Sequence, residues 1–228
     1  MFFFHSKIKV GESGILQDFT DYHSHILPGV DDGVQKMEES MAILSLLEKQ
    51  GVRTVWLTPH IMEDTPNDPN ELQSRFDRFC EAYRGGIELK LAAEHMLDGL
   101  FQTRFQVGEL LPHTGNELLV ETSYFTPPMA LEQTLTGIMK KGYYPLLAHP
   151  ERYEYMDEED YGHLHDLGVR FQCNLPSLAG AYGPRVQQKA EKLLKSGWYS
   201  KAGNDIHSLH FLQSFLESKI SKKILNLV

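Results

Sequence analysis

Short apolar segments alternate with amphipathic segments along the chain, and this alternation most limits the folds that the sequence can adopt. The segments predicted as strands are 18–23, 52–58, 87–93, 117–120, 143–148, 169–173 and 198–202. The segments predicted as helices are 36–50, 67–83, 97–105, 127–141, 157–167, 185–195 and 208–219. Such alternation is typical of parallel strands joined by right-handed crossovers. Seven units in 228 residues predict an α/β fold and favour a small barrel, although an open sheet gives a similar pattern.

The composition predicts one ordinary globular domain with an acidic surface. Apolar residues make up 41% of the chain, which is enough for a sizeable core. The 22 lysines and arginines against 31 aspartates and glutamates include no basic block, so nucleic acid is not an expected partner. No apolar run approaches the roughly 18 residues of a membrane span. We expect an N-terminal arm over 1–17 and a single domain over 18–228.

The two cysteines, Cys80 and Cys173, lie far apart without the spacing of a metal or redox motif. So few cysteines favour a reducing compartment. The start of the chain has no long apolar segment followed by a cleavage site, as a secretory signal would have. We therefore expect a cytoplasmic protein.

The stretch 21–33 reads Asp-Tyr-His-Ser-His-Ile-Leu-Pro-Gly-Val-Asp-Asp-Gly. His23 and His25 are one residue apart at the end of a predicted strand, where alternate side chains share a face. Asp32 follows in a loop that Pro28 and Gly29 allow to fold back. Neutral imidazoles with carboxylate oxygens suit zinc, manganese or iron. The alternative is an exposed histidine pair in a turn.

Further residues with metal-binding side chains stand at the ends of other predicted strands. Together with the first stretch they are His23, His25, Asp32, His60, Glu94, Glu121, His149, Asp205 and His207. The carboxyl ends of the strands of a parallel barrel meet at one face, where active sites lie. Uncompensated carboxylates would repel one another there, so bound cations are expected. Taken singly, each residue has the alternative of a turn residue or a solvated strand end.

Nine such ligands can hold three metal ions if some carboxylates bridge. Clustered metal ions hold a phosphate and generate hydroxide at neutral pH for attack on phosphorus. Arg152 follows His149 by three residues, and its planar guanidinium is placed to make bidentate hydrogen bonds to phosphate oxygens. The alternative is a surface ion pair of Arg152 with Glu151 or Glu154.

Four of the remaining histidines, His95, His113, His163 and His165, are expected to lie outside this group. His163 and His165 are two apart on a predicted helix, where side chains do not share a face. His95 follows Glu94 on a strand and should point away from it. His113 is expected on the surface of a loop.

These motifs resemble those of the PHP (polymerase and histidinol phosphatase) superfamily, and within it the bacterial capsule-type protein-tyrosine phosphatases. The matching segments are 23–33 (HSHILPGVDDG), 58–60 (TPH), 93–94 (AE), 120–123 (VETS), 148–153 (AHPERY) and 205–207 (DIH). They run in order from residue 23 to residue 207, nearly the whole chain.

The resemblance implies a distorted seven-stranded TIM-like barrel with three metal ions, most often manganese, with iron or zinc possible. It implies His23, His25, Glu94 and Asp205 around one ion, Glu94, Glu121 and His149 around the second, and Asp32, His60 and His207 around the third. It gives catalytic roles to Arg152, Asp205 and His207.

The implied activity is that of a metal-dependent phosphoric monoester hydrolase. Its substrate would be phosphotyrosine in the tail of a membrane tyrosine autokinase that controls capsule or exopolysaccharide synthesis and export. The protein itself would not insert into the membrane.

The sequence departs from the family at one point that matters for phosphate binding. Family members place a second arginine shortly after the Asp-x-His pair, but residues 209–212 read Leu-His-Phe-Leu and no arginine follows Arg185.

Two other functions fit the same motifs. One is a phosphoesterase for a small phosphomonoester such as histidinol phosphate, and the other is a non-catalytic, metal-stabilised domain that binds the kinase tail.

Overall fold

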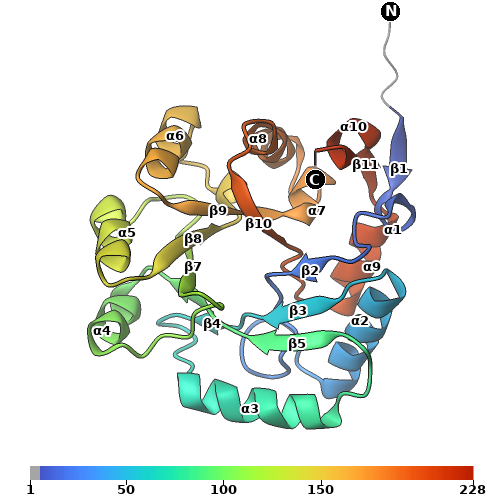
Figure 1. Ribbon diagram of the computed structural model, residues 1–228, viewed down its shortest axis with the longest axis horizontal. Coiled ribbons are helices and arrows are strands. Elements are labelled where there is room, and N and C mark those ends of the chain that lie inside the picture. Colours follow the sequence, from blue (N-terminus) through green and yellow to red (C-terminus); the bar gives the residue numbers. More distant parts are fainter. Residues whose placement is uncertain (1–5, 228) are drawn as a thin grey trace, which may run out of the picture.

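Helices surround a central group of strands in the computed structural model, which describes residues 6–227 (Figure 1). The strands are β1 (Lys7–Lys9), β2 (Thr20–Asp21), β3 (Thr54–Leu57), β4 (His60–Ile61), β5 (Glu88–Leu91), β6 (Glu94–Met96), β7 (Glu117–Glu121), β8 (Tyr144–Ala148), β9 (Arg170–Asn174), β10 (Tyr199–Gly203) and β11 (Lys219–Ser221). The helices are α1 (Val10–Ser13), α2 (Met37–Lys49), α3 (Pro69–Ala82), α4 (Gly99–Val107), α5 (Leu131–Lys140), α6 (Glu158–Asp166), α7 (Leu175–Leu178), α8 (Pro184–Lys195), α9 (Leu209–Glu217) and α10 (Lys222–Leu225), with a 3-10 helix η1 (Pro150–Arg152) after β8.

The central strands form two parallel sheets, which confirms the predicted mixed α/β class. One sheet has six strands in the order β10-β9-β8-β7-β6-β4, and the other has three in the order β2-β3-β5. The described strands are therefore not one closed sheet of seven strands, as the predicted barrel would be. Strands β7 and β8 are buried along nearly their whole length, as expected for parallel strands covered on both faces.

The predicted strands 52–58 and 87–93 correspond to β3 and β5, and each is followed after a short break by a strand of the other sheet, β4 or β6. Pro59 has no amide hydrogen and separates β3 from β4, and Ala92 and Ala93 separate β5 from β6. Backbone hydrogen bonds join these two breaks to each other: Ala92 N donates to Leu57 O (3.0 Å), and Glu94 N donates to Pro59 O (3.1 Å). Strands β4 and β6 lie beyond the predicted strand ends at residues 58 and 93 and were not predicted.

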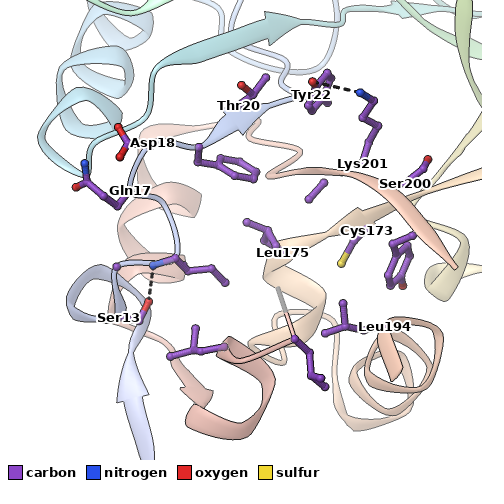
Figure 2. Close-up of a pocket in the computed structure, with 17 residues that line it drawn as sticks. Ser13, Gln17, Asp18, Thr20, Tyr22, Cys173, Leu175, Leu194, Ser200 and Lys201 are labelled. Carbon is purple, nitrogen blue, oxygen red and sulfur yellow. Dashed lines mark hydrogen bonds between the residues drawn. The ribbon is translucent and has the colours of Figure 1, made fainter. Parts of the chain in front are cut away.

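A seam between β2 and β10 separates the two sheets. Beyond the ends of these strands Asp205 N donates to His23 O (2.8 Å) and His25 N to Ile206 O (2.9 Å). Beside β2 and β10 themselves lies a cavity of about 650 Å³, whose wall includes Thr20 and Lys201 (Figure 2). These hydrogen bonds thus connect the two sheets at the face that carries the predicted ligands.

Six of the seven predicted helices have ends within two residues of the prediction. Their ends are set by caps that the sequence carries, such as Asp68 before Pro69 in α3 and the reciprocal capping box of Asp157 and Asp160 in α6. The exception is α5, which was predicted from residue 127 and begins at Leu131. Pro127 and Pro128 stay in the loop because a proline disfavours helical backbone at the residue before it.

The predicted N-terminal arm contains structured residues. Residues 1–5 of the arm lie outside the described part, whereas β1 pairs antiparallel with β11, with Lys7 opposite Ser221. Val10 and Leu16 are both buried in the core that also contains Ile220. The first and last described strands of the chain are therefore neighbours (Figure 1). None of the helices between residues 6 and 227 is both long and apolar enough to cross a bilayer.

His113 was predicted on the surface, and this prediction was wrong. Its side chain is buried against Trp56 in an edge-on contact, and its Nε2 donates to Tyr22 O (3.1 Å). Burial lowers the pKa of His113 to about 3. The imidazole is therefore neutral in the folded protein at pH values where the unfolded chain already binds a proton.

We expect this buried histidine to make the fold sensitive to mild acid. The folded pKa lies below the unfolded value of about 6.5, so stability is complete above pH 6.5 and falls as the pH drops below it. At pH 5.5 the loss attributable to His113 should be about 1.4 kcal/mol. Urea unfolding of chelator-treated wild type and His113→Gln at pH 7.0 and 5.5 measures it. An equal loss in both proteins would contradict the assignment.

Candidate metal centre

Two glycines let the backbone approach the first histidine pair closely. A Cβ atom on Gly203, at the end of β10, would lie 2.4 Å from the Cβ of His23. A Cβ atom on Gly33 would lie 2.1 Å from the backbone oxygen of His25. These distances are shorter than any real contact, so both positions require glycine. The loop after His25 therefore folds back on it, as the sequence predicted.

The structure brings all nine predicted ligand residues to one end of the sheets. Seven of them are buried, namely His23, His25, His60, Glu94, Glu121, His149 and Asp205. The side chain of His207 is 33% exposed and that of Asp32 is 73% exposed. The nine residues come from seven separate places along the chain, which meet because parallel strands end at a common face.

The first group of ligand atoms belongs to His23, His25 and Glu94. The Nε2 atoms of the two imidazoles are 3.0 Å apart, and Glu94 Oε2 is 3.1 Å from the first and 3.3 Å from the second. Asp205 Oδ1 lies 3.4 Å from each of the two nitrogens. Two carboxylates and two imidazole nitrogens thus converge on one point.

The outer nitrogens of these imidazoles fix where their protons are. His23 Nδ1 lies 2.7 Å from Gln172 Oε1, and His25 Nδ1 lies 2.8 Å from Asp31 Oδ2. Both partners are acceptors, so each Nδ1 carries a proton, and a ring that is neutral then has its lone pair on Nε2. Two lone pairs 3.0 Å apart, beside carboxylate oxygens, repel one another unless a cation or a proton lies between them.

The second group is formed by His60, Glu94 and Glu121. His60 Nδ1 lies 3.2 Å from Glu94 Oε2 and 3.2 Å from Glu121 Oε1. His149 Nε2 is 3.0 Å from Glu94 Oε1 and 3.8 Å from Glu121 Oε2. His60 therefore joins the residues that the resemblance implied for the second ion, and Glu94 belongs to the first and second groups.

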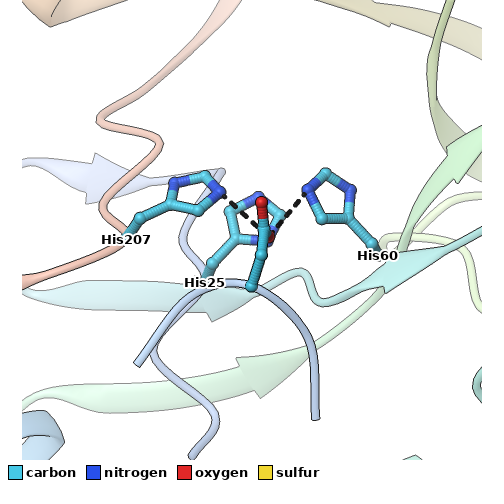
Figure 3. Close-up of side chains that lie close together, drawn as sticks. His25, His60 and His207 are labelled. Carbon is cyan, nitrogen blue, oxygen red and sulfur yellow. Dashed lines mark ion pairs between the residues drawn. The ribbon is translucent and has the colours of Figure 1, made fainter. Parts of the chain in front are cut away.

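The third group is more open and contains His25, Asp32, His60 and His207. Figure 3 shows the imidazoles of His60 and His207 on either side of His25. Asp32 Oδ1 lies 3.4 Å from His60 Nε2 and 3.5 Å from His207 Nε2. This group reaches the surface, because Asp32 is exposed and His207 is partly exposed.

The electrostatics of the buried groups favour charged carboxylates. Burial opposes ionisation of Glu94, but His23 and the other neighbouring imidazoles hold the pKa of its carboxyl well below the usual range. Burial likewise opposes ionisation of Asp205, yet the histidines around it hold its pKa well below the usual range. Both groups are thus anionic near neutral pH, in surroundings where an unpaired charge is costly.

The donor set fits a cluster of divalent metal ions. Glu94 Oε2, His60 Nδ1 and His149 Nδ1 are buried and make no hydrogen bond. The first two point at the convergent ligand atoms, where a cation would satisfy them. Imidazole nitrogen with carboxylate oxygen suits zinc, iron and manganese.

Asp205 and Arg152 connect the ligands to the cleft. Arg152 Nη1 donates to Asp205 Oδ2 (2.7 Å), so Oδ1 is the oxygen that faces the imidazoles. The alternative of a surface pair of Arg152 with Glu151 or Glu154 was not found. Asp205 and His149 both have left-handed backbone, with φ of 51° and 34°. Non-glycine residues rarely adopt this conformation, and those that do are concentrated at functional sites.

A cleft of about 300 Å³ opens over the ligands. Its lining contains seven of the nine ligand side chains, all except His23 and His25, together with Met62, Met96, Tyr124 and Arg152. Of the lysine and arginine side chains between residues 6 and 227, Arg152 alone lines this cleft. A phosphate entering it would meet one permanent side-chain cation.

Sequence reasoning missed several residues that hold the ligands in place. Asp31 accepts from His25, and the proximity of His25 holds the pKa of this buried carboxyl down at about 2 although burial opposes it. Gln172, in the middle of β9, binds His23 Nδ1 through Oε1 and Tyr22 O through Nε2. The Asp-Asp pair in the sequence was a signal for Asp31, whereas nothing in the sequence marked Gln172.

We expect Gln172→Leu to weaken metal binding about 10- to 100-fold, because it removes the acceptor that fixes the proton on His23 Nδ1. Isothermal titration of chelator-treated protein with Mn²⁺ measures this change. Gln106→Leu, at an exposed position on α4, is the matched control. Unchanged affinity in Gln172→Leu would show that the contact does not orient the ligand.

His95, His163 and His165 lie where they were predicted. His163 and His165 are exposed on α6, with 57% and 44% of their side chains accessible. His95 points away from Glu94 and its Nδ1 lies 3.2 Å from Leu119 O. None of these three contributes a ligand atom to the groups described above.

The fold resembles that of a solved bacterial structure. The structure matched is described as "Crystal structures of YwqE from Bacillus subtilis and CpsB from Streptococcus pneumoniae, unique metal-dependent tyrosine phosphatases". The two folds superpose with a TM-score of 0.79 over 91% of this chain and 90% of the other, at 23% sequence identity.

Sequence comparison finds relatives of similar length. This chain is 27% identical over 196 residues to the tyrosine-protein phosphatase YwqE of Bacillus subtilis, covering 83% of this chain and 77% of that protein. It is 29% identical over 204 residues to the tyrosine-protein phosphatase CpsB of Streptococcus pneumoniae, covering 83% of each. The family described as "Capsular polysaccharide synthesis, CpsB/CapC" matches residues 19–217, and the chain belongs to this CpsB/CapC family.

Proposed function

We propose that this chain is a metal-dependent protein-tyrosine phosphatase that hydrolyses phosphotyrosine in the cleft lined by Arg152. The main support is the 3.0 Å separation of two imidazole lone pairs, on His23 and His25, beside the Glu94 carboxylate. A metal ion between the nitrogens would stabilise that arrangement, and clusters of metal ions are suited to phosphate ester hydrolysis. The relatives' names, tyrosine-protein phosphatases, supply the substrate class.

We assign three metal ions to the three groups, with manganese first and iron or zinc as alternatives. The first ion would be held by His23, His25, Glu94 and Asp205, the second by Glu94, Glu121 and His149, and the third by Asp32, His60 and His207. The distances of 3.0–3.8 Å among these ligand atoms support the assignment. When bound, such ions polarise a phosphoryl group and lower the pKa of water.

The side chains of the cleft bind and orient the substrate. Arg152 uses one Nη1 hydrogen for Asp205, which leaves other N–H groups of its planar fork for phosphate oxygens. His207 Nδ1 is 3.0 Å from the backbone oxygen of Asp205, so its Nε2 keeps a lone pair to bind an ion or accept a proton. The tyrosinate leaving group has a pKa of about 10 and departs with little protonation.

The proposal includes a distorted seven-stranded barrel as one domain over 18–228. Each of the interrupted pairs β3/β4 and β5/β6 would count as one bent strand. Hydrogen bonds across the seam support this description, since Tyr22 N donates to Ala202 O (3.2 Å) and Asp205 N to His23 O (2.8 Å). The ligands of such a barrel would all lie at its carboxyl-terminal mouth.

We further propose a cytoplasmic protein that acts on the phosphotyrosine-bearing tail of a membrane tyrosine autokinase. Cys80 and Cys173 are both free, which agrees with a reducing compartment. The family's description, capsular polysaccharide synthesis, links the substrate to polysaccharide production.

Metal removal and restoration test the proposed function. Purified protein treated with a chelator and then dialysed should lose hydrolysis of p-nitrophenyl phosphate. Adding Mn²⁺, Fe²⁺ or Zn²⁺ separately should restore it, most fully with the physiological ion. His163→Ala, which changes an exposed imidazole, should respond like the wild type. Hydrolysis that persists unchanged after chelation would rule out the proposal.

The substrate class needs its own comparison. A phosphotyrosyl peptide and histidinol phosphate should be offered to the same Mn²⁺-loaded protein, and kcat/KM measured for each. We expect the peptide to be preferred, in keeping with the names of the relatives. A preference for histidinol phosphate would leave the proposed metal centre unchanged and contradict phosphotyrosine as the substrate.

A further inference from the structure

Two tyrosine rings enclose the one arginine that lines the cleft. The guanidinium carbon of Arg152 lies 4.5 Å from the ring centre of Tyr124 and 4.4 Å from that of Tyr182. Such distances are those of cation–π contacts, which are strongest where the cation is shielded from water. Tyr124 follows β7, and Tyr182 lies in the loop between α7 and α8.

Tyr182 is also connected to Arg152 through hydrogen bonds. Asn174 Nδ2 donates to the Tyr182 hydroxyl (3.4 Å) and to Asp205 Oδ2 (3.2 Å). The same Asp205 oxygen accepts from Arg152 Nη1 (2.7 Å). Arg152, Asp205, Asn174 and Tyr182 thus form a closed ring of contacts around the side of the cleft.

The far side of Tyr182 is supported as well. Its ring centre is 6.3 Å from that of Phe211 on α9, and burial raises the pKa of Tyr182 to about 12. The phenol therefore stays neutral over the working pH range. Gly180 and Gly183, both with positive φ, flank the tyrosine and shape the tight loop that presents it.

Precise orientation of Arg152 matters more here than in a cleft with two arginines. No arginine follows Arg185 in the sequence, and Arg152 is the one permanent side-chain cation on the cleft wall among residues 6–227. A two-pronged contact with phosphate requires the guanidinium plane to face the ligand. A freely rotating side chain would lose much of that contact to conformational entropy.

We propose that Tyr182 is a positioning residue, which holds the Arg152 guanidinium against Asp205 so that a single arginine can bind the phosphate group. This inference rests on the proposed phosphatase function for its consequence in turnover. Its direct consequence is for phosphate binding, which can be measured without turnover.

Paired variants separate the ring from its hydroxyl. Tyr182→Leu removes the ring and should weaken inorganic phosphate binding to the Mn²⁺-loaded protein roughly 2- to 30-fold, as expected for loss of a shielded cation–π contact. It should raise KM for p-nitrophenyl phosphate by a similar factor with a smaller change in kcat. Tyr182→Phe keeps the ring and should restore most of the affinity. Phosphate binding equal to wild type in Tyr182→Leu would overturn the proposal.

A double-mutant cycle distinguishes positioning from general structural damage. Tyr182→Leu should have almost no further effect on phosphate affinity in an Arg152→Ala background, because there is no guanidinium left to hold. Effects that simply add would overturn the proposal. Manganese content and the thermal midpoint should match the wild type. Should Tyr182→Leu not fold, Tyr182→Met takes its place with the same expected and contrary results.

Failure of this inference can be told apart from failure of the proposed function. If the wild type shows no metal-dependent turnover, the phosphatase proposal fails, yet phosphate titrations of the same variants still test Tyr182. If turnover is present and the Tyr182 variants bind phosphate normally, only the positioning role fails.

Discussion

Glu94→Gln is expected to reduce p-nitrophenyl phosphate hydrolysis by about a thousandfold, since metal ions supply several kcal/mol of transition-state stabilisation and each 1.36 kcal/mol is a factor of ten. Glu94 Oε2 lies within 3.3 Å of nitrogens of His23, His25 and His60, and Oε1 lies 3.0 Å from His149. The glutamine amide is uncharged and has one oxygen where the carboxylate has two. Both the first and the second ligand groups therefore lose a member.

Elemental analysis together with steady-state kinetics measures this result. The variant should contain less manganese than wild type, and excess Mn²⁺ should restore only part of the activity. Glu81→Gln, at an exposed position on α3, removes the same charge without touching the site and should keep full activity. Full activity and full metal content in Glu94→Gln would refute the shared role of this carboxylate.

Arg152→Lys is expected to lower kcat/KM by about a hundredfold, with little change in metal content. Hydrogen bonds to charged groups contribute about 1.5–3 kcal/mol each, and a lysine cannot replace the two parallel donors of the fork. Lysine also presents no flat face to Tyr124 and Tyr182. Because Asn174 still donates to Asp205, the aspartate keeps one partner and the fold should be retained.

Kinetics with p-nitrophenyl phosphate and manganese analysis measure the effect of Arg152→Lys. Arg75→Lys is the matched control, since Arg75 is 40% exposed on α3 and pairs with Glu71 one turn away. Its activity should equal that of the wild type. A change of less than threefold in Arg152→Lys would place phosphate recognition elsewhere in the cleft.

The helices were the part of the fold most readily predicted from sequence. Their apolar spacing and their caps are local properties, so α3 and α6 could be placed within two residues. The start of α5 could not, because the prolines at 127 and 128 were interpreted as a helix start although they belong to the preceding loop. Strands β1 and β11 have three residues each and pair across nearly the whole chain, so no local pattern marks them.

The ligand residues were predicted because one rule covers them all: the ends of parallel strands meet. This rule needs only the order of strands and helices, and it brought His149 and Asp205 to the same place as His23. It cannot say which atoms touch. Gln172 lies inside a strand and Tyr182 lies in a loop, and their contacts with His23 and Arg152 depend on the packing of distant segments.

The backbone hydrogen bond from Asp205 to His23 has a consequence for how the protein is made. The two halves of the first ligand group stand near opposite ends of the chain, so during translation the early histidines leave the ribosome long before their partners exist. Contacts between such distant residues also make folding slow. Tight capture of metal should therefore come late, only after nearly the whole chain has been synthesised.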